Sequence, residues 1–410
     1  MSKGNKDLIV ALDIGTSMIV ALVAELTVEG ELSVIGRGTH DSRGLKNGVV
    51  VNIEETVDAI SGAIAEAELM ADCKVDVVYT GIAGSHIRSF NSDGMVAVAD
   101  KEVSPPDVAR ALETARARPM PTDQEILHVL PQEFIIDEQG GIREPIGMNG
   151  KRLEVKVHIV TGAISAAQNI IKCVRRCGLE VSNIVLQPLA SSYAVLSQDE
   201  KDLGVCMLDI GGGTTDIAIW TRGAIRYTAV IPDAGDLVTT DIAMMLHTPR
   251  RDAEDLKCRY GCALAQLTDP EDFLDVPGVD ERPPRKVSRH TLANVIQARV
   301  EEIYEKVLKE IVRAGYGEVL SSGIVITGGA SLMPGMVELG EEIFHMSVRQ
   351  AVPRYSSGGL SDVVRNARFS TAYGLLLVAQ EECRRGLKIE KKRTLRDSWN
   401  DLIAWFGKNF

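Results

Sequence analysis

Two short glycine-containing segments, about two hundred residues apart, constrain the fold of this chain more than any other feature. In the second segment the apolar run 205–208 ends at Asp209, three glycines follow, and another apolar run occupies 217–220. This pattern predicts two strands joined as a hairpin, with Asp209 and Asp216 at the two ends of the turn. One glycine usually suffices for an ordinary hairpin turn, so three in a row favour a backbone that closely approaches a bulky anion.

The side chains of this turn favour a magnesium phosphate as the anion. Consecutive backbone N–H groups can line a phosphate nest, and the two threonines add hydroxyl donors. The carboxylates of Asp209 and Asp216 would repel phosphate, so they are better suited to hold Mg²⁺ through water while phosphates supply its other ligands. The predicted phosphate contacts are Gly211, Gly212, Gly213, Thr214 and Thr215.

The same arrangement occurs near the start of the chain. The apolar run 8–12 leads into Asp13, and a second apolar run follows at 19–24. We expect Asp13 to be a second carboxylate that holds Mg²⁺ through water. The predicted phosphate contacts of this hairpin are Gly15, Thr16 and Ser17. Two such hairpins indicate two halves that are built alike and face one nucleotide.

A third glycine turn follows the apolar run 324–326 and contains Gly328, Gly329 and Ala330. It has no flanking acid, so a neutral part of the ligand, adenosine, suits it better than a magnesium phosphate. One glycine turn is weak evidence for a nucleotide site. Three of them in this order and spacing are a far more specific signal.

The composition narrows the class of protein. A chain of 410 residues with 45% hydrophobic residues predicts two or more globular domains. The net charge of −12 argues against nucleic-acid binding, because no positive field would gather phosphates. Seven scattered cysteines are typical of a reducing cytosol, and we expect structural thiols rather than a metal site. We expect neither a signal peptide nor a membrane-spanning segment.

The three turns together resemble the two phosphate loops and the adenosine loop of the actin, sugar-kinase and heat-shock-70 superfamily. Within it, segments 128–134, 145–153 and 157–160 are similar to the inserted subdomain of the FtsA family. These are bacterial actin-like cell-division proteins that tether the FtsZ ring to the membrane. The resemblance implies an α/β actin-like ATPase fold with two duplicated core domains, an FtsA-type inserted subdomain and a C-terminal amphipathic helix.

The resemblance also implies a division of the chain into parts. Core domain I is expected at 1–85, 160–202 and 361–383, interrupted by the inserted subdomain at 86–159. Core domain II is expected at 203–231 and 301–360, with an outer nucleotide-side subdomain at 232–300. A basic linker at 384–394 and an amphipathic membrane-targeting helix at 395–410 would complete the chain.

Three side chains are assigned to the nucleotide site by the resemblance. Gln187 matches the connecting-helix residue that orients the attacking water, although a helix-start residue without a chemical role is the alternative. Glu254 and Lys257 match the helix that packs against adenine and ribose. On spacing alone a solvated i,i+3 ion pair is the competing explanation. The resemblance implies ATP with Mg²⁺ as the ligand, and at most slow ATP hydrolysis.

The outer subdomain carries the positions expected to bind a partner. In the family the FtsZ C-terminal tail docks there, and Arg285, Arg299 and Glu302 match those positions. Arg289 adds a cation that could receive an acidic peptide. For any single charge here, a solvated helix face is the alternative.

The C-terminal stretch is the second informative part of the sequence. A basic run at 384–396 precedes apolar residues that fall within one sector of a helix, including one of two nearby tryptophans. A short aromatic amphipathic helix behind a basic linker favours the interface of an anionic membrane, although docking onto the protein itself is the alternative. The predicted membrane contacts are Leu395, Trp399, Leu402, Ile403, Phe406 and Phe410.

These observations predict an actin-like ATP-binding cell-division protein that self-assembles and anchors the FtsZ ring. The expected location is the cytoplasmic face of the bacterial inner membrane at the division site, where it would help to recruit later division proteins. Alternatives are a pilus-assembly actin-like scaffold and a sugar-kinase-like phosphotransferase. A heat-shock-70 chaperone would need a β-rich peptide-binding domain, for which only some thirty residues remain.

Overall fold

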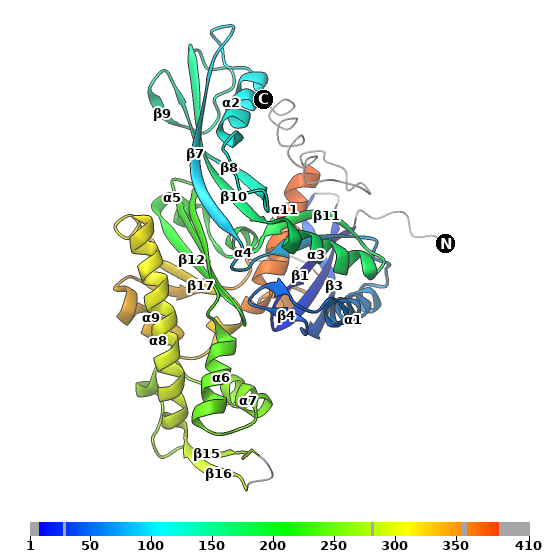
Figure 1. Ribbon diagram of the computed structural model, residues 1–410, viewed down its shortest axis with the longest axis vertical. Helices are drawn as coiled ribbons and strands as arrows, with labels where there is room; N and C mark the ends of the chain where they lie inside the picture. Colours follow the sequence, from blue (N-terminus) through cyan, green and yellow to red (C-terminus); the bar gives the residue numbers. More distant parts are fainter. Residues whose placement is uncertain (1–7, 28–29, 280–282, 355–358, 385–410) are drawn as a thin grey trace.

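The computed structural model describes residues 8–27, 30–279, 283–354 and 359–384 of the chain. These residues form two five-stranded sheets, one four-stranded sheet and two sheets of two strands. Figure 1 shows an elongated molecule with the four-stranded sheet at the top and the two five-stranded sheets side by side in the middle. A small helical part with a two-stranded sheet lies at the bottom.

Lobe I, on the right in Figure 1, is built on the first five-stranded sheet, in the order β11-β6-β1-β2-β3. β1 and β2 form an antiparallel hairpin, while β6 is parallel to β1 and β11 is parallel to β6. Its strands are β1 (Leu8–Ile14), β2 (Met18–Leu26), β3 (Leu32–Asp41), β6 (Val77–Ile82) and β11 (Glu180–Leu186), and its helices are α1 (Ile53–Ala71), α3 (Ile164–Arg176), α4 (Gln187–Val195) and α11 (Ser370–Arg384). The short helix α5 (Gln198–Leu203) follows α4 and packs against β13 (Thr215–Thr221) of the second five-stranded sheet. A two-stranded sheet of β4 (Leu45–Lys46) and β5 (Val49–Val50) follows β3. β1 and β2 are almost continuously apolar and buried, as expected for strands of a sheet whose two faces are both covered.

Lobe II repeats this topology. Its sheet has the order β14-β13-β12-β17-β18, so each lobe has a three-stranded meander followed by two parallel strands. The strands are β12 (Val205–Ile210), β13 (Thr215–Thr221), β14 (Ala224–Ile231), β17 (Ile324–Thr327) and β18 (Val348–Gln350), and the helices are α8 (Arg289–Ala314) and α9 (Met336–Phe344). The prediction of two duplicated core domains is confirmed.

The inserted subdomain is the four-stranded sheet, in the order β7-β10-β8-β9. Its elements are β7 (Arg88–Ala97), α2 (Pro105–Arg116), β8 (Gln124–Ile136), β9 (Gln139–Ile142) and β10 (Arg152–Ala163). Ser104 caps α2 and Pro105 is its first residue, and both residue types are favoured at these positions. β8 is continuous through Pro131. Proline is tolerated there because β9 pairs only with the end of β8, and the register shifts nearby.

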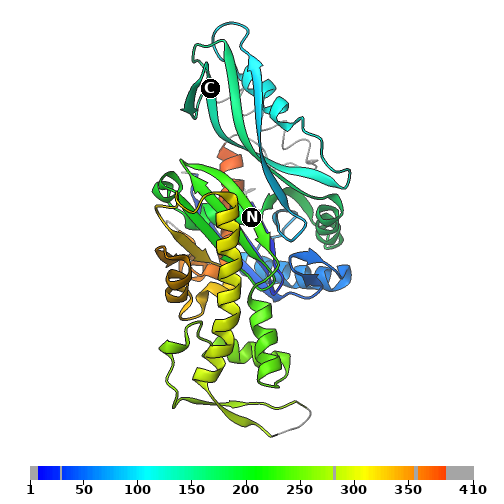
Figure 2. The ribbon, with the colours of Figure 1, turned by 60° about the vertical axis from the view of Figure 1, so that its left-hand side comes forward.

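The outer part of lobe II lies below the lobe II sheet in Figure 1. It contains α6 (Gly235–Met245), α7 (Arg250–Tyr260), the 3₁₀ turn η1 (Ala265–Leu267), β15 (Phe273–Val276) and β16 (Arg285–Ser288). Figure 2 shows α8 running from this part up along the sheet, so one long helix joins the two. Its apolar stripe is buried against both, in keeping with the helical spacing of the apolar residues in this segment.

The remaining described elements are short: η2 (Gly329–Leu332), α10 (Ser361–Val364) and η3 (Ala367–Phe369). The predicted linker beyond residue 384 and the membrane-targeting helix at 395–410 lie outside the described residues. Among the helices that the structure describes, none has the length and apolarity needed to cross a membrane. The domain boundaries given by the sequence stay a prediction.

Candidate functional site

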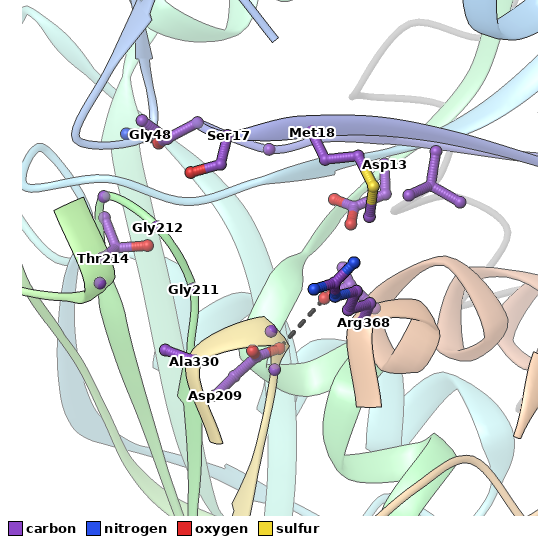
Figure 3. A pocket seen from close by; sticks show the side chains of 18 of the residues that line it. Asp13, Ser17, Met18, Gly48, Asp209, Gly211, Gly212, Thr214, Ala330 and Arg368 are labelled. Carbon is purple, nitrogen blue, oxygen red and sulfur yellow. Dashed lines mark hydrogen bonds between the residues drawn. The ribbon is translucent and has the colours of Figure 1, made fainter. Parts of the chain in front are cut away.

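A cavity of about 330 Å³ lies where the two lobes meet, and three turns from different parts of the chain line it. Figure 3 shows the hairpin with Ser17 opposite the hairpin with Gly211 and Gly212, and the turn with Ala330 beside the second hairpin. The lining includes Asp13, Gly15, Thr16, Ser17, Gln187, Asp209, Gly211, Gly212, Gly213, Thr214, Glu254, Lys257, Gly328, Gly329 and Ala330. The structure therefore brings together all the predicted nucleotide and metal residues except Thr215.

Thr215 corrects the sequence prediction. Its side chain is fully buried as the first residue of β13, and its hydroxyl donates to the backbone carbonyl of Asp233 at 2.7 Å. A side chain that points into the sheet cannot offer its hydroxyl to a phosphate. The alternation of a strand places Thr214 and Thr215 on different sides, and only Thr214 lines the cavity.

The two hairpin turns touch each other. A Cβ atom on Gly212 would lie 1.7 Å from Ser17 Oγ, and one on Gly213 would lie 2.5 Å from Thr16 Oγ1. The backbones can approach so closely only because these positions carry no side chain. The second turn also accepts hydrogen bonds from the start of α6, where Gly235 N donates to Gly211 O at 3.1 Å.

Three aspartates are buried at the base of this contact. Asp209 and Asp216 lie directly opposite each other in the β12–β13 hairpin, and Asp13 comes from the equivalent hairpin of lobe I. Burial, and secondly the charge of Asp209, raises the pKa of Asp13 to about 7. Burial and the charges of Asp209 and Asp13 hold the pKa of Asp216 well above its usual range. Like charges this close indicate a site that a cation would stabilise.

The hydrogen bonds of these carboxylates come from both lobes. Gln187 Nε2 donates to Asp13 Oδ1 at 2.9 Å. Ser191 Oγ and Thr371 Oγ1 donate to Asp209 Oδ2 at 2.5 and 3.1 Å. Burial raises the pKa of Asp209 although these two hydroxyls act in the opposite direction. α4 and α11 thus reach the second hairpin from lobe I.

The buried acids fit a hydrated cation better than a directly bound one. Within the described ranges no group of three His, Cys, Asp or Glu side chains is arranged to hold a metal by itself. Asp216 Oδ1 is buried without a hydrogen-bond partner in the structure. A solvated ion beside it would satisfy that oxygen and offset the charge of all three carboxylates. This donor set fits Mg²⁺ bound through water, with phosphates completing its shell.

The opposite end of the cavity is lined by α7 and the third turn. Lys257 Nζ donates to Glu254 Oε2 at 2.7 Å, to Thr239 Oγ1 at 2.8 Å and to Gly235 O at 3.1 Å. Burial alone would raise the pKa of Glu254, but the Lys257 ammonium outweighs it and holds that pKa below its usual range. The pair is therefore part of the cavity wall and not a freely solvated ion pair.

The third turn comes close to the carboxylate of Asp209. Gly328 has a φ of +88°, and a Cβ atom there would lie 2.4 Å from Asp209 Oδ1. A glycine is needed at this position both for its backbone conformation and for the space. Ala330 packs near Gly235, at the start of α6, so this turn joins the cavity wall of the outer part.

Comparison with known proteins identifies the family. The model described as "Cell division protein FtsA" matches residues 206–374, and the model for the SHS2 domain inserted in FtsA matches residues 84–161. The cell division protein FtsA of Pseudomonas aeruginosa is 57% identical over 382 residues, which cover 93% of this chain and 91% of that protein. The FtsA of Escherichia coli K12 is 42% identical and covers 99% of both chains. The chain belongs to the FtsA family.

Solved structures with low sequence identity share the fold of this FtsA-family chain. A PilM–PilN type IV pilus biogenesis complex superposes with a TM-score of 0.65 at 16% identity, covering 93% of this chain and 98% of the other. MreB5 of Spiroplasma citri bound to AMPPNP gives 0.57 at 17% identity, covering 94% and 100%. The protein is thus an actin-like cell-division protein, as the sequence predicted. The resemblance to FtsA is confirmed over almost the whole chain.

Several residues that line the cavity of the FtsA-family chain were not predicted from the sequence, among them Arg368 and Thr371. Arg368 and Thr371 line the cavity from η3 and the start of α11. The duplication of the lobes offers a signal, because Gln187 begins α4 and Thr371 lies at the start of α11. No local motif marks either residue, since both reach the site only through the packing of distant segments.

The predicted partner-binding residues lie away from the cavity, on the outer part and α8. Arg299 is paired with Asp241 at 2.5 Å and with Glu302. Arg289 lies 3.7 Å from Asp272, and Arg285 donates to the carbonyl of Leu246 at 2.5 Å. The four residues are thus engaged in local contacts on one end of lobe II.

Proposed function

We propose that this FtsA-family protein binds ATP with Mg²⁺ between its two lobes and couples the nucleotide to its assembly at the division site. One observation carries the proposal: two hairpins of like design, one from each lobe, bring Asp13 and Asp209 to a single cavity. A related fold, that of MreB5 from Spiroplasma citri, has been solved with AMPPNP and with ADP. A ligand that contacts both hairpins would favour the closed arrangement of the lobes.

The proposed roles follow the cavity from end to end. Backbone N–H groups of the two glycine turns would bind the phosphates, with Ser17 and Thr214 as hydroxyl donors. Asp13 and Asp209 would hold Mg²⁺ through water, and the ion would neutralise charge on the phosphates. Glu254, Lys257 and the third turn would frame the adenosine. Gln187 would orient a water molecule, and we expect ATP hydrolysis to be slow at most.

The division role is proposed from the family together with the surface of lobe II. The tail of FtsZ would dock on the outer part, at Arg285, Arg289, Arg299 and Glu302. Copies of the protein would assemble into filaments or oligomers and help to recruit later division proteins. Family membership supports this proposal, since actin-like proteins of this family act in cell division.

The membrane role is proposed from the composition of the last sixteen residues. These include two of the three tryptophans of the chain and follow a basic run. An amphipathic helix of this kind would lie in the interface of an anionic membrane, where each Lys or Arg contributes about 1 kcal/mol. The protein would then be a peripheral protein of the cytoplasmic face of the inner membrane.

The nucleotide proposal is tested with Asp209→Asn, which keeps the shape of the side chain and removes its charge. We expect ATP affinity in the presence of Mg²⁺ to fall about tenfold or more, because a charge-assisted contact contributes about 1.5–3 kcal/mol. The matched control is Asp275→Asn, an exposed aspartate of β15. Titration of a fluorescent ATP analogue with and without Mg²⁺ measures the effect. An unchanged Mg²⁺-dependent affinity in Asp209→Asn would refute the site.

The membrane proposal is tested by flotation with liposomes that contain anionic lipid. We expect the full chain to float with the liposomes and a chain that ends at Lys392 to remain at the bottom of the gradient. Each is measured with and without ATP. Equal flotation of the two chains would contradict the membrane role and leave the nucleotide proposal intact.

A further inference from the structure

The inserted subdomain is attached to lobe II through a polar seam. We use this name for the contacts of Ser89, Asn91, Gln132 and His158 with β14. Gln132 Nε2 donates to the carbonyl of Ile225 at 2.9 Å, and Ser89 Oγ donates to the carbonyl of Thr228 at 2.8 Å. The seam is buried around His158, so its hydrogen bonds fix where the subdomain sits on lobe II.

His158 has both ring nitrogens engaged in this seam. Its Nδ1 lies 2.9 Å from Asn91 Oδ1, and its Nε2 lies 3.0 Å from Thr228 Oγ1. Asn91 Oδ1 also accepts from Gln132 Nε2, so it faces two donors. His158 therefore carries its proton on Nδ1 and accepts from Thr228 at Nε2.

A second imidazole of the same sheet reaches lobe I. His128 lies on β8, and its Nε2 accepts the backbone N–H of Leu186 at 2.9 Å. β11 is an edge strand of its sheet, so an outward N–H at its end has no strand to pair with. The inserted subdomain supplies the missing acceptor. Burial lowers the pKa of His128 to about 4, in keeping with a neutral ring whose Nε2 is free to accept.

The residue that follows Leu186 belongs to the cavity. Gln187 begins α4, and its Nε2 donates to Asp13 Oδ1 at 2.9 Å. A Cβ atom on Gly81 would lie 2.7 Å from Gln187 Cγ, so a glycine leaves the space through which this side chain passes. The backbone at Leu186 therefore sets where the Gln187 amide meets Asp13.

We propose that His128 is a positioning residue of the nucleotide site, which holds the backbone at Leu186 so that Gln187 meets Asp13. The inserted subdomain is thereby part of the site although none of its residues lines the cavity. The inference rests on the proposed nucleotide function. It goes beyond that function because it gives the segment 128–134 a role inside the molecule.

The test uses the full chain with four single variants and one double variant. His128→Leu removes the acceptor and fills the space with an apolar side chain, while His128→Gln keeps an acceptor oxygen near the position of Nε2. Gln187→Ala removes the cavity contact. His158→Leu is the matched control, because it removes a buried imidazole from the same sheet that contacts lobe II and not Leu186.

Two measurements are made on each variant: hydrogen exchange of the Leu186 amide by mass spectrometry, and affinity for a fluorescent ATP analogue with Mg²⁺. We expect His128→Leu to speed the exchange about tenfold and to weaken the affinity about fivefold, as for the loss of one hydrogen bond. His128→Gln restores both, and His158→Leu leaves the exchange of Leu186 unchanged. In the double variant with Gln187→Ala, the losses of affinity do not add.

The proposal is overturned by unchanged exchange of Leu186 in His128→Leu, or by equally fast exchange in His158→Leu. Additive losses of affinity for His128→Leu and Gln187→Ala would also overturn it, because the two residues would then act separately. If the wild-type protein does not bind the analogue, the proposed nucleotide function itself is refuted. The exchange measurement still decides, in that case, whether His128 holds the backbone at Leu186.

Discussion

Replacing Gly213 by alanine tests whether the two hairpin turns must touch. A Cβ atom at this position would lie 2.5 Å from Thr16 Oγ1 and 2.7 Å from Thr16 Cγ2. Thr16 cannot rotate away, because both branches of its side chain are in the path and its hydroxyl accepts the N–H of Gly48 at 3.0 Å. The backbones must therefore separate by about 0.9 Å to reach an ordinary contact of 3.4 Å.

The size of the effect follows from this geometry. Forced overpacking costs about 1–3 kcal/mol of stability in the nucleotide-free protein. Turns that have moved apart also lose charge-assisted contacts with the phosphates, each about 1.5–3 kcal/mol. We therefore expect Gly213→Ala to weaken the affinity for ATP with Mg²⁺ by about tenfold to a hundredfold, and to lower the melting temperature.

The neighbouring Gly211 provides a matched control. A Cβ atom there would lie 3.4 Å from the carbonyl of Thr214, which is an ordinary contact, and the backbone of neither glycine is left-handed. Gly211→Ala should therefore leave stability unchanged or slightly raised, since alanine restricts the unfolded chain.

The assay is titration of a fluorescent ATP analogue with Mg²⁺, together with thermal unfolding in its absence. Adding Thr16→Ala to Gly213→Ala removes the two nearest atoms and should recover part of the lost affinity. If Gly213→Ala binds the analogue as well as the unchanged protein does, the turns need not touch and the reasoning is wrong.

Two further predictions concern the charged groups of the cavity. Burial raises the pKa of Asp13 from its usual value of 3.8 to about 7 on folding. The native state therefore binds the extra proton, and stability falls as the pH rises from about 4 to about 7. Urea unfolding should show a weaker pH dependence of the unfolding free energy in Asp13→Asn across this range, and an equal dependence would contradict the assignment. Lys257→Met should lower stability by about 1–3 kcal/mol and weaken nucleotide binding, because Glu254 and Thr239 lose their shared donor; unchanged binding in isothermal titration calorimetry would remove Lys257 from the site.

The parts of the site that the sequence revealed are those encoded locally. An apolar run, an acid and a glycine turn are contiguous, so the two hairpins with Asp13 and Asp209 could be found without coordinates. The topology then follows, because two such hairpins in one chain indicate duplicated halves. The continuity of β8 through Pro131 could not be predicted from the neighbouring residues alone. It depends on which strands pair with β8 at that position.

Other features depend on contacts between distant segments. Thr215 looked like a phosphate donor beside Thr214, but the pleat of β13 turns its hydroxyl to Asp233. Arg368 and Thr371 reach the cavity only because α11 returns to lobe I after lobe II is complete. His128 and Leu186 lie in different parts of the sequence. Their hydrogen bond could be recognised only once the structure showed Leu186 at the end of an edge strand.

The polar seam also covers an exposed edge of the lobe II sheet. β14 is the outermost strand of its sheet, and its free carbonyls at Ile225, Arg226 and Thr228 accept hydrogen bonds from side chains of the inserted subdomain. A strand whose outward groups are already occupied cannot serve as a template for a foreign chain. The inserted subdomain therefore covers this edge of the sheet and leaves few backbone groups there for the addition of another strand.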